Sequence, residues 1–338
     1  MTEGREGADR ELHESEFPFG LRFITAGFFG LLAILVFWVG SSSEAYVSDL
    51  DQIWHASRAL LDGKDPYDLT QLPSQLEWGF PLFYPLPALV AAIPLGLMPL
   101  QLAQLLFVGL STALLAFGVT KWGPRGLWIF ASGAYLGGLA NAQWSPILTA
   151  ALLLPWLAPI LVAKPSVGIA LMLSGPGRKF ILLAVSGAFL LTGLSFLLDP
   201  AWVGKWVDVV SQAPHFRPPL LLMGGPLLLL ALLRWRRWEA RLLLALACIP
   251  HTTLVYEALP LLLIGRGWRQ LMLLAGLSLV VFAAQFRLDS RVAIGEPGAM
   301  EAFAAWTHSV GSLSVALIYL PALIMVLRRP NDWSGIRL

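Results

Sequence analysis

The sequence predicts an all-α protein, a polytopic membrane helix bundle of about 10–12 spans, and two observations lead to this prediction. Hydrophobic residues make up 57% of the 338-residue chain, whereas charged residues make up only 13%. A soluble domain averages about a quarter charged residues, so a mean hydropathy of +0.70 places the chain in the membrane class. Apolar stretches of roughly ten to twenty residues also recur from end to end, which leaves no room for a separate soluble domain.

The composition also excludes several classes of function. A net charge of +2 without a basic stripe gives no sign of a nucleic-acid partner. Cys248 is the single cysteine, so no internal disulfide forms. The chain has no second histidine near His251 at metal-ligand spacing, no glycine-rich phosphate loop after a strand and no GxSxG motif. We therefore expect no metal and no cofactor.

The apolar stretches define the predicted membrane domain, residues 23–327. A full crossing needs about 20 apolar residues, and several of the candidates are too short to cross alone. Residues 1–22 are polar and mixed in charge, which predicts a cytosolic tail rather than a signal peptide, and residues 328–338 form a second cytosolic tail. The candidate spans are 23–39, 84–98, 102–120, 127–139, 147–163, 167–173, 180–198, 220–233, 242–249, 254–264, 271–285 and 310–327.

Basic residues predict how these spans are oriented, because lysine and arginine concentrate in cytosolic loops. The strongest basic clusters are then cytosolic, and residues 40–82, 199–218 and 286–308 form outer loops. Lys121 and Arg125 fall on the outer side in this arrangement, against the rule. The clusters are Arg178 with Lys179, Arg234 with Arg236, Arg237 and Arg241, Arg266 with Arg269, and Arg328 with Arg329.

This topology requires two turning points at the outer face, at Lys164-Pro165 and at Pro250-His251. Both bring an ionisable side chain to the face that also carries Asp49. A buried lysine needs an anionic partner such as a phosphate, or it snorkels to the surface. His251 can act as acid, base or hydrogen-bond donor, or it can be structural. An intramembrane polar residue is by default a functional hypothesis.

The first outer loop is the most polar part of the chain. Asp49 and Asp51 flank Leu50 and point in different directions on a helix, so only one of them faces a given site. A carboxylate there can act as general base, or it can be solvated or cap the following helix. Residues 54–61 predict an amphipathic interface helix, on which Arg58 pairs with a lipid phosphate or with Asp62. Residues 202–210 predict a second interface helix.

Several short motifs resemble a known family. They are D-L-x-x-x-x-x-A-x-R-A-L-L-x-G-x-D-P-Y from Asp49 to Tyr67, F-Y-P from Phe83 to Pro85, N-A-Q from Asn141 to Gln143, Lys164-Pro165 and Pro250-His251. Their order and spacing resemble the polyprenol-phosphate-sugar-dependent glycosyltransferases of family 87, which belong to the multi-spanning GT-C class. The chain departs from the family pattern at Ala142, Leu86 and Ile249.

The resemblance implies a function and a set of site residues. It implies transfer of a hexose, with mannose favoured, from a polyprenyl-phosphate-linked donor to a glycolipid or glycan acceptor. Transfer would invert the anomeric centre on the non-cytosolic face of a membrane, which we expect to be the bacterial plasma (inner) membrane. Asp49 would be the general base, His251 would line the site and Lys164 would contact the phosphate. The remaining expected substrate-binding residues are Tyr84, Gln143, Asp51 and Arg58, the last of which is our own suggestion.

Two other functions are compatible with a polar site inside a helix bundle. A lipid or solute transporter, or a flippase without catalysis, also uses broken helices, although transporters often carry internal repeats and none is visible here. A purely structural membrane subunit is the second alternative. It would leave the carboxylate-rich loop, Lys164 and His251 on one face without explanation.

Overall fold

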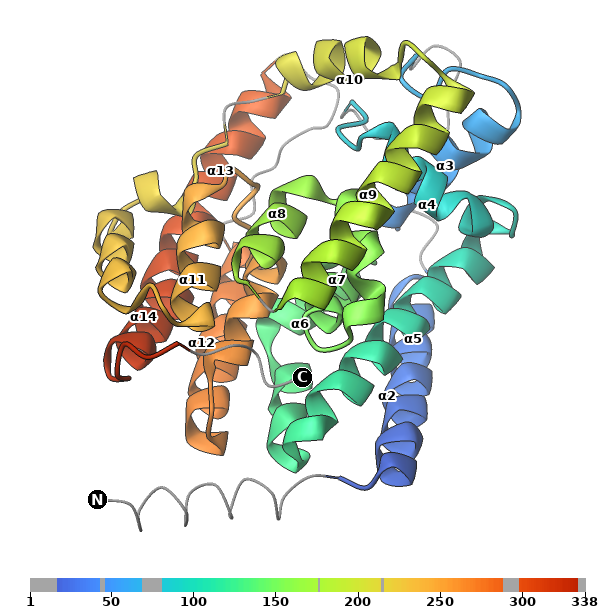
Figure 1. The fold of residues 1–338 in the computed structure, drawn as a ribbon. Helices are drawn as coiled ribbons and strands as arrows, with labels where there is room; N and C mark the ends of the chain where they lie inside the picture. Colours follow the sequence, from blue (N-terminus) through green and yellow to red (C-terminus); the bar gives the residue numbers. More distant parts are fainter. Residues whose placement is uncertain are drawn as a thin grey trace.

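The computed structural model describes residues 17–42, 46–68, 81–175, 177–213, 216–287 and 298–333, and the regular elements in this part of the chain are all helices. Figure 1 shows the helices packed into one bundle, with α10 lying across one end, here called the upper end. The lower end is the one at which α2 begins. The predicted all-α membrane bundle is thereby confirmed. The α-helices are α2 (Phe19–Gly40), α3 (Asp49–Leu61), α4 (Leu86–Gly96), α5 (Leu100–Val119), α6 (Gly133–Ala140), α7 (Ser145–Ala151), α8 (Pro165–Leu173), α9 (Arg178–Leu198), α10 (Trp202–Ser211), α11 (Trp238–Cys248), α12 (Trp268–Arg287), α13 (Ala299–Ser314) and α14 (Leu320–Leu327).

Helical segments of other types connect several of these helices. A π-helical segment, η8 (Val315–Tyr319), joins α13 to α14. The others are 3₁₀ helices: η2 (Thr120–Trp122), η3 (Pro124–Ala131), η4 (Pro155–Ala163), η5 (Pro219–Leu221), η6 (Gly225–Arg234) and η7 (Val255–Ile264).

Five stretches of the described chain are long and apolar enough to cross a membrane alone. They are Phe19–Gly40, Leu100–Trp122, Arg178–Leu198, Trp268–Gln285 and Glu301–Leu327. The other predicted spans are short or broken: residues 127–139 are divided between η3 and α6, and residues 147–163 between α7 and η4. Irregular backbone at membrane depth is tolerated only where protein surrounds it. All seven residues of the short helix α7 are buried, whereas η3 and η4 expose Trp128 and Trp156 at the surface.

Small residues allow the first two long helices to pack closely. The buried residues of α2 repeat every three or four positions, as one face of a helix requires. At the contact, a Cβ on Gly30 would lie 3.0 Å from the carbonyl oxygen of Gly109 in α5. The opposite face of α2 exposes large apolar side chains such as Phe28 and Leu31, as expected for a surface that meets lipid.

The predicted positions of Lys121 and Arg125 are wrong. The prediction counted residues 84–98 as a crossing, but α4 has only 11 residues and packs against α3. The indole of Trp54 in α3 donates to the carbonyl of Met98 at 3.0 Å, so α5 begins beside α3. At its far end, Arg22 donates to the carbonyl of Phe117 at 2.7 Å. Lys121 and Arg125 follow that end and lie with the start of α2.

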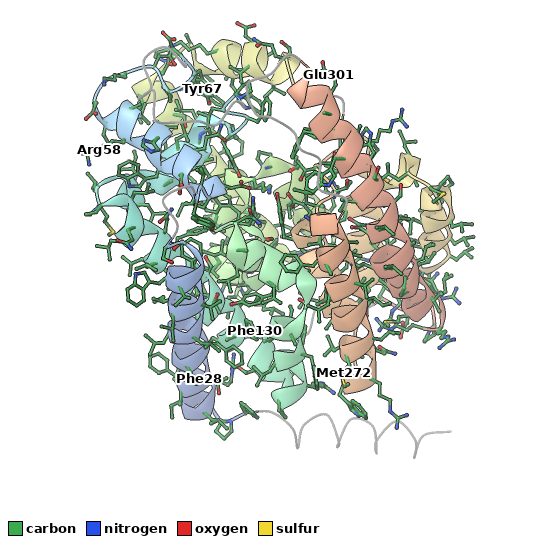
Figure 2. The ribbon with its side chains drawn as sticks, turned by 180° about the vertical axis from the view of Figure 1, so that it is seen from behind. Phe28, Arg58, Tyr67, Phe130, Met272 and Glu301 are labelled. Carbon is green, nitrogen blue, oxygen red and sulfur yellow. The ribbon has the colours of Figure 1, made fainter. Side chains whose placement is uncertain are left out.

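Figure 2 supports this arrangement of the two ends. Arg58, Tyr67 and Glu301 are labelled toward the upper end, and Phe28 and Met272 toward the lower end, where α12 begins. The basic residues after α5 therefore share an end with the start of α12. The predicted outer loop 286–308 is also shorter than expected, because α13 begins at Ala299. Its polar residues Thr307 and His308 belong to a helix that continues to Leu327.

A buried carboxylate joins three separated segments. Glu239, at the start of α11, has none of its surface exposed. Its Oε1 accepts from Arg329 at 2.9 Å, from Arg266 at 2.9 Å and from Arg237 at 3.3 Å. Arg329 also donates to the carbonyl of Ile264 at 2.5 Å. This cluster fixes the chain after α14 against α11 and against the turn that leads into α12.

We expect Glu239→Gln to destabilise the protein by about 3–5 kcal/mol, because removing one partner of a buried ion pair leaves uncompensated charge. Buried Arg329 would then lose its only carboxylate partner in the described chain, whereas Arg237 would keep its ion pair with Asp332. Thermal unfolding of the purified protein in detergent measures the effect. Glu301→Gln makes the same chemical change at an exposed position and serves as the control. Equal melting temperatures for the two variants would contradict the prediction.

Candidate functional site

Lys164, which is partly exposed, and buried Glu257 form an ion pair between the broken helices. The Nζ of Lys164 lies 2.5 Å from Oε1 of Glu257, which is 1% exposed. The same ammonium donates to Oε1 of Gln143 at 3.1 Å and lies 5.3 Å from the ring centroid of Tyr256. Three segments that are far apart in sequence therefore meet at Lys164: the turn after α6, the junction of η4 with α8, and η7.

The local sequence explains why Lys164 stands at a break. The residue before a proline is disfavoured in the α conformation, and Lys164 has φ −135° and ψ 82°. Pro165 then occupies the first turn of α8, where its missing N–H removes no helix hydrogen bond. Because the backbone at Lys164 is not helical, its side chain can point toward Glu257 and Gln143, which it contacts.

Asp49 is the first residue of α3, and its position is fixed from two sides. Its backbone N–H donates to the carbonyl of Asn141 at 3.1 Å, which ties the start of α3 to the turn that carries Gln143. Behind it, Asp51 accepts from the N–H of Ser48 at 3.0 Å, from the hydroxyl of Ser48 at 2.5 Å and from Gln104 at 2.6 Å. Asp51 is thus occupied by the helix N-terminus, and Asp49 is the carboxylate left to face Lys164.

The surroundings of Asp49 raise its pKa from 3.8 to about 7. Burial is the largest cause, because a low-dielectric environment disfavours the charged form. The positive charge of Lys164 opposes this rise, whereas the negative charges of Glu257 and Asp51 add to it. Asp49 nevertheless retains intermediate exposure to solvent. The site therefore holds a carboxyl group that lies in a low-dielectric environment but can still be reached from solvent. This group is about half ionised near neutral pH.

His251 and Tyr84 border the same charges and stay neutral. Burial lowers the pKa of His251, although Glu257 acts in the opposite direction. Its Nδ1 lies 2.7 Å from the carbonyl oxygen of Ile249, so the ring proton sits on Nδ1 and Nε2 is an acceptor. Burial raises the pKa of Tyr84 well above its usual value, with Asp49 and Glu257 adding to the rise. Tyr84 is therefore a protonated phenol beside the carboxylates.

Two strained residues shape the loops that carry the site. Ala142 has φ 46° and Thr253 has φ 52°, in the left-handed region that L residues avoid. Such strain is tolerated where the surrounding structure holds it, often at functional sites. The hydroxyl of Thr253 donates to the carbonyl of Thr307 at 2.8 Å. A Cβ on Gly311 would lie 2.4 Å from that hydroxyl, so only glycine permits this approach.

The structure thus brings together five of the seven residues named as site candidates: Asp49, Tyr84, Gln143, Lys164 and His251. Asp51 lies behind Asp49 in the helix cap. Arg58 is exposed and donates to the carbonyl of Gly96 at 3.2 Å, in the contact between α3 and α4. It takes no part in the contacts around Lys164.

The sequence prediction missed Glu257 and Tyr319 as members of the cluster. A signal for Glu257 was present, because a single carboxylate interrupts an otherwise apolar run from Val255 to Ile264. Tyr319 interacts electrostatically with Glu257. It lies in the π-helical segment η8, and nothing in its local sequence distinguishes it from a core tyrosine.

Comparison with protein-family models, with curated proteins and with solved structures finds no match to this chain. The site is therefore described by its own geometry. In the described part of the chain, no group of three or more histidine, cysteine, aspartate or glutamate side chains is arranged to hold a metal ion.

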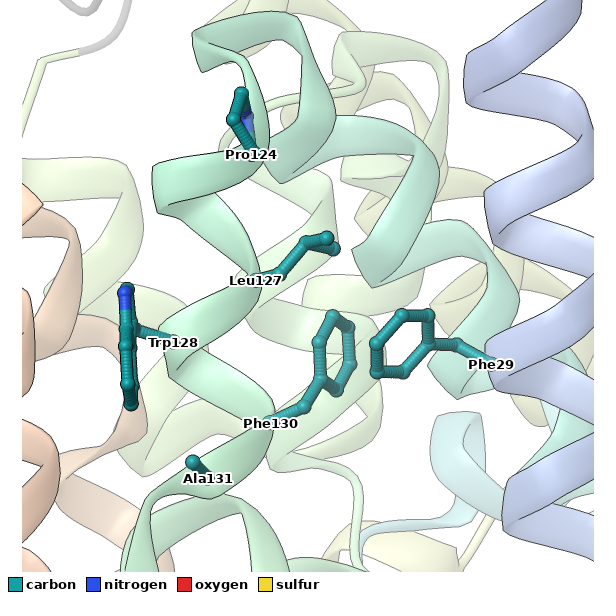
Figure 3. Close-up of a pocket in the computed structure, with 6 residues that line it drawn as sticks. All are labelled: Phe29, Pro124, Leu127, Trp128, Phe130 and Ala131. Carbon is teal, nitrogen blue, oxygen red and sulfur yellow. The ribbon is translucent and has the colours of Figure 1, made fainter.

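A hollow of about 410 Å³ lies elsewhere in the protein, between α2 and η3. Figure 3 shows the rings of Phe29 and Phe130 packed against each other in its lining, and their centroids are 4.4 Å apart. The other lining residues are Pro124, Leu127, Trp128 and Ala131. This lining is almost entirely apolar and contains none of the charged groups described above, so we do not assign the hollow to the site.

We expect Ala142→Gly to stabilise the protein by about 1 kcal/mol, because left-handed backbone costs an L residue roughly 1–2 kcal/mol that glycine avoids. Ala283→Gly is the matched control, since Ala283 lies within helix α12 and is exposed. There the same substitution should destabilise by about 1 kcal/mol. Melting temperatures that move in opposite directions would support the strained conformation, and two decreases would contradict it.

Proposed function

We propose that this protein is a membrane glycosyltransferase. It would move a hexose, mannose by the motif resemblance, from a polyprenyl-phosphate-linked donor to a hydroxyl of a glycolipid or glycan acceptor. The observation that carries the proposal is Asp49, which opens the resembling motif and has a pKa raised to about 7 among polar groups from distant segments. A general base works best when its pKa lies near the operating pH.

The chemistry assigned to Asp49 is a proton transfer. Its carboxylate takes the proton from the acceptor hydroxyl while that oxygen forms a bond to the anomeric carbon. The bond between the anomeric carbon and the donor phosphate oxygen breaks, and the polyprenyl phosphate leaves with the bonding electron pair. Attack opposite the leaving group inverts the anomeric centre. Because the leaving group is already a phosphate, the step requires little beyond a base and correct positioning.

The arrangement of helices suits a donor that is anchored in lipid. The polar cluster is surrounded by short buried helices, while α2 and α9 expose apolar side chains around the bundle. Figure 1 shows α6, α7 and α8 in the interior and α10 across the upper end. The indole of Trp206 in α10 donates to the carbonyl of Phe83 at 3.0 Å, next to Tyr84. This end would face the non-cytosolic side and would receive the acceptor.

A second candidate function is proton-coupled transport, and the charge balance of the site favours it. Asp49, Asp51 and Glu257 outnumber Lys164, the one cation that lies among them in the described chain. A buried carboxylate that titrates near neutral pH is also the element that proton-coupled transporters use. Transport would give pH-dependent solute uptake into vesicles without any transfer of sugar. The sugar-transfer assay therefore discriminates between the two functions.

We expect Asp49→Asn to lower the rate of sugar transfer by a factor of about 10²–10⁴, the usual contribution of a general base. The assay supplies radiolabelled polyprenyl-phosphate-mannose and a lipid extract to the protein in nanodiscs. Asp62→Asn is the control, because Asp62 is exposed where α3 ends. Transfer by Asp49→Asn at the wild-type rate would remove the base assignment. A folded wild type that transfers no lipid-linked sugar would shift the proposal to transport.

The pH dependence of transfer gives an independent prediction. Asp49 must be ionised to accept a proton, so kcat/KM should rise about tenfold per pH unit below pH 7 and level off above it. Stability should change in the opposite direction. Between pH 3.8 and about 7 the folded state binds the proton more tightly than the unfolded state, so this group's contribution declines as pH rises. A rate that does not change between pH 5.5 and 8 would contradict the prediction.

A further inference from the structure

Four buried polar atoms around the Lys164–Glu257 pair have no hydrogen-bond partner in the protein. The side chains that carry them are 1–7% exposed. Leaving a buried polar atom unpaired costs about 1–3 kcal/mol, so four in one place indicate a binding site rather than a packing accident. The atoms are Nε2 of Gln143, Nε2 of His251, Oε2 of Glu257 and the hydroxyl of Tyr319.

Gln143 and Glu257 contact the ammonium of Lys164, at 3.1 and 2.5 Å. His251 and Tyr319 lie close enough to interact electrostatically with this ion pair, His251 with both charges and Tyr319 with Glu257. The four side chains come from the turn after α6, from the loop before η7, from η7 itself and from η8. A π-helical segment such as η8 is rare and is frequently found at functional sites.

The hydrogen-bonding character of each atom follows from its neighbour. Lysine only donates, so Gln143 presents its oxygen to Lys164. Its amide nitrogen, a donor, interacts with the phenol of Tyr256 but reaches no acceptor at hydrogen-bond distance. The Nδ1 of His251 donates to the carbonyl of Ile249, which leaves Nε2 as an acceptor. The second oxygen of Glu257 is also an acceptor. The hydroxyl of Tyr319 can donate or accept.

This set does not suit a phosphate. Phosphodiester oxygens only accept hydrogen bonds, so they would be repelled by the unpaired acceptors of His251 and Glu257. The positive charge of Lys164 is already neutralised by the carboxylate that lies 2.5 Å away. A hydroxyl group both donates and accepts, and neighbouring hydroxyls of a sugar can bond to acceptors and donors that alternate around them.

We infer that Gln143, His251, Glu257 and Tyr319 form a subsite for the vicinal hydroxyls of the hexose. Lys164 acts as a positioning residue that holds Glu257 and orients the amide of Gln143. The inference rests on the proposed function, because it places the donor's sugar within the same site. It assigns the phosphate and the polyprenyl chain to a different part of the protein.

Binding measurements test the subsite without depending on turnover. Radiolabelled polyprenyl-phosphate-mannose and sugar-free polyprenyl phosphate are titrated onto the protein in nanodiscs. We expect the wild type to prefer the sugar-bearing lipid, and Tyr319→Phe to reduce that preference about three- to tenfold, the effect of one lost hydrogen bond. Tyr135→Phe is the matched control, because the buried hydroxyl of Tyr135 pairs with Thr112. Its preference should equal that of the wild type.

Glu257→Gln should reduce the preference more than tenfold, since hydrogen bonds to a charged group are stronger. If this variant fails to fold because Lys164 is left unpaired, the double substitution Lys164→Met with Glu257→Gln removes both charges and carries the same expectation. A preference that survives in Tyr319→Phe and in the Glu257 variants would overturn the subsite. Sugar transfer by the wild type would then leave the proposed function standing.

A second pair of probes tests the sugar subsite independently of the polyprenyl-linked donor. Octyl mannoside and octyl phosphate are added below their micelle-forming concentrations, and thermal stabilisation is recorded. If octyl mannoside stabilises the wild type more than it stabilises Tyr319→Phe, the result supports the subsite. This holds even if the wild type binds no polyprenyl lipid. That second result would instead remove the polyprenyl-linked donor from the proposed function. Equal stabilisation by both probes, or none by octyl mannoside, would overturn the subsite.

Discussion

The ion pair between Lys164 and buried Glu257 is the constraint on which the interior of the protein depends. Two charges removed from water are costly even when they pair, and within a membrane bundle the cost rises further. The pair persists because Gln143 supplies a second acceptor and the ring of Tyr256 lies beneath the ammonium. Meeting these requirements forces three segments, separated by up to about a hundred residues, to break their helices at the same depth. The hydrogen bond from its N–H to the carbonyl of Asn141 then holds Asp49 where it interacts electrostatically with the pair.

The broken helices follow from the same constraint. A continuous helix directs its side chains outward and uses all its backbone groups internally, so it cannot deliver several polar side chains to one point. The breaks at Ala142, Lys164 and Thr253 do so at the expense of backbone strain and of unsatisfied polar groups. The long helices α2, α5, α9 and α12 enclose these segments and allow irregular backbone away from lipid. Long α-helices therefore make up much of the exterior, together with the exposed 3₁₀ helix η6, and the polar residues gather at irregular backbone in the centre.

Much of this architecture could be predicted from the sequence, and the limits have physical causes. Long uniform apolar runs fixed α2, α5, α9 and α12 to within a few residues, because length and composition decide such helices. The topology near Lys121 was mispredicted because hydrophobicity cannot distinguish an 11-residue helix that packs on α3 from a crossing. Lys164 and His251 stood out as polar residues in apolar surroundings, and Asp49 stood out in a carboxylate-rich loop that opens the resembling motif. Tyr319 did not, since its membership depends on the π-helical turn, which no local pattern signals.

The charge of the site decides how the two proposed functions differ. With Asp49 ionised, Asp49 and Glu257 face one ammonium and Asp51 lies behind them, so an anionic donor would be repelled unless a proton or cation accompanied it. The raised pKa of Asp49 supplies a way around this repulsion, because the neutral form persists until about pH 7. The donor then meets a less negative site, and Asp49 loses its proton before it serves as base. A glycosyltransferase with this site would bind its donor best at the acidic side of its activity profile, whereas a transporter would use the same proton as its coupled ion. The same residues could therefore serve catalysis or transport. In catalysis Asp49 gives up its proton after the donor binds, whereas in transport the proton moves together with the ligand.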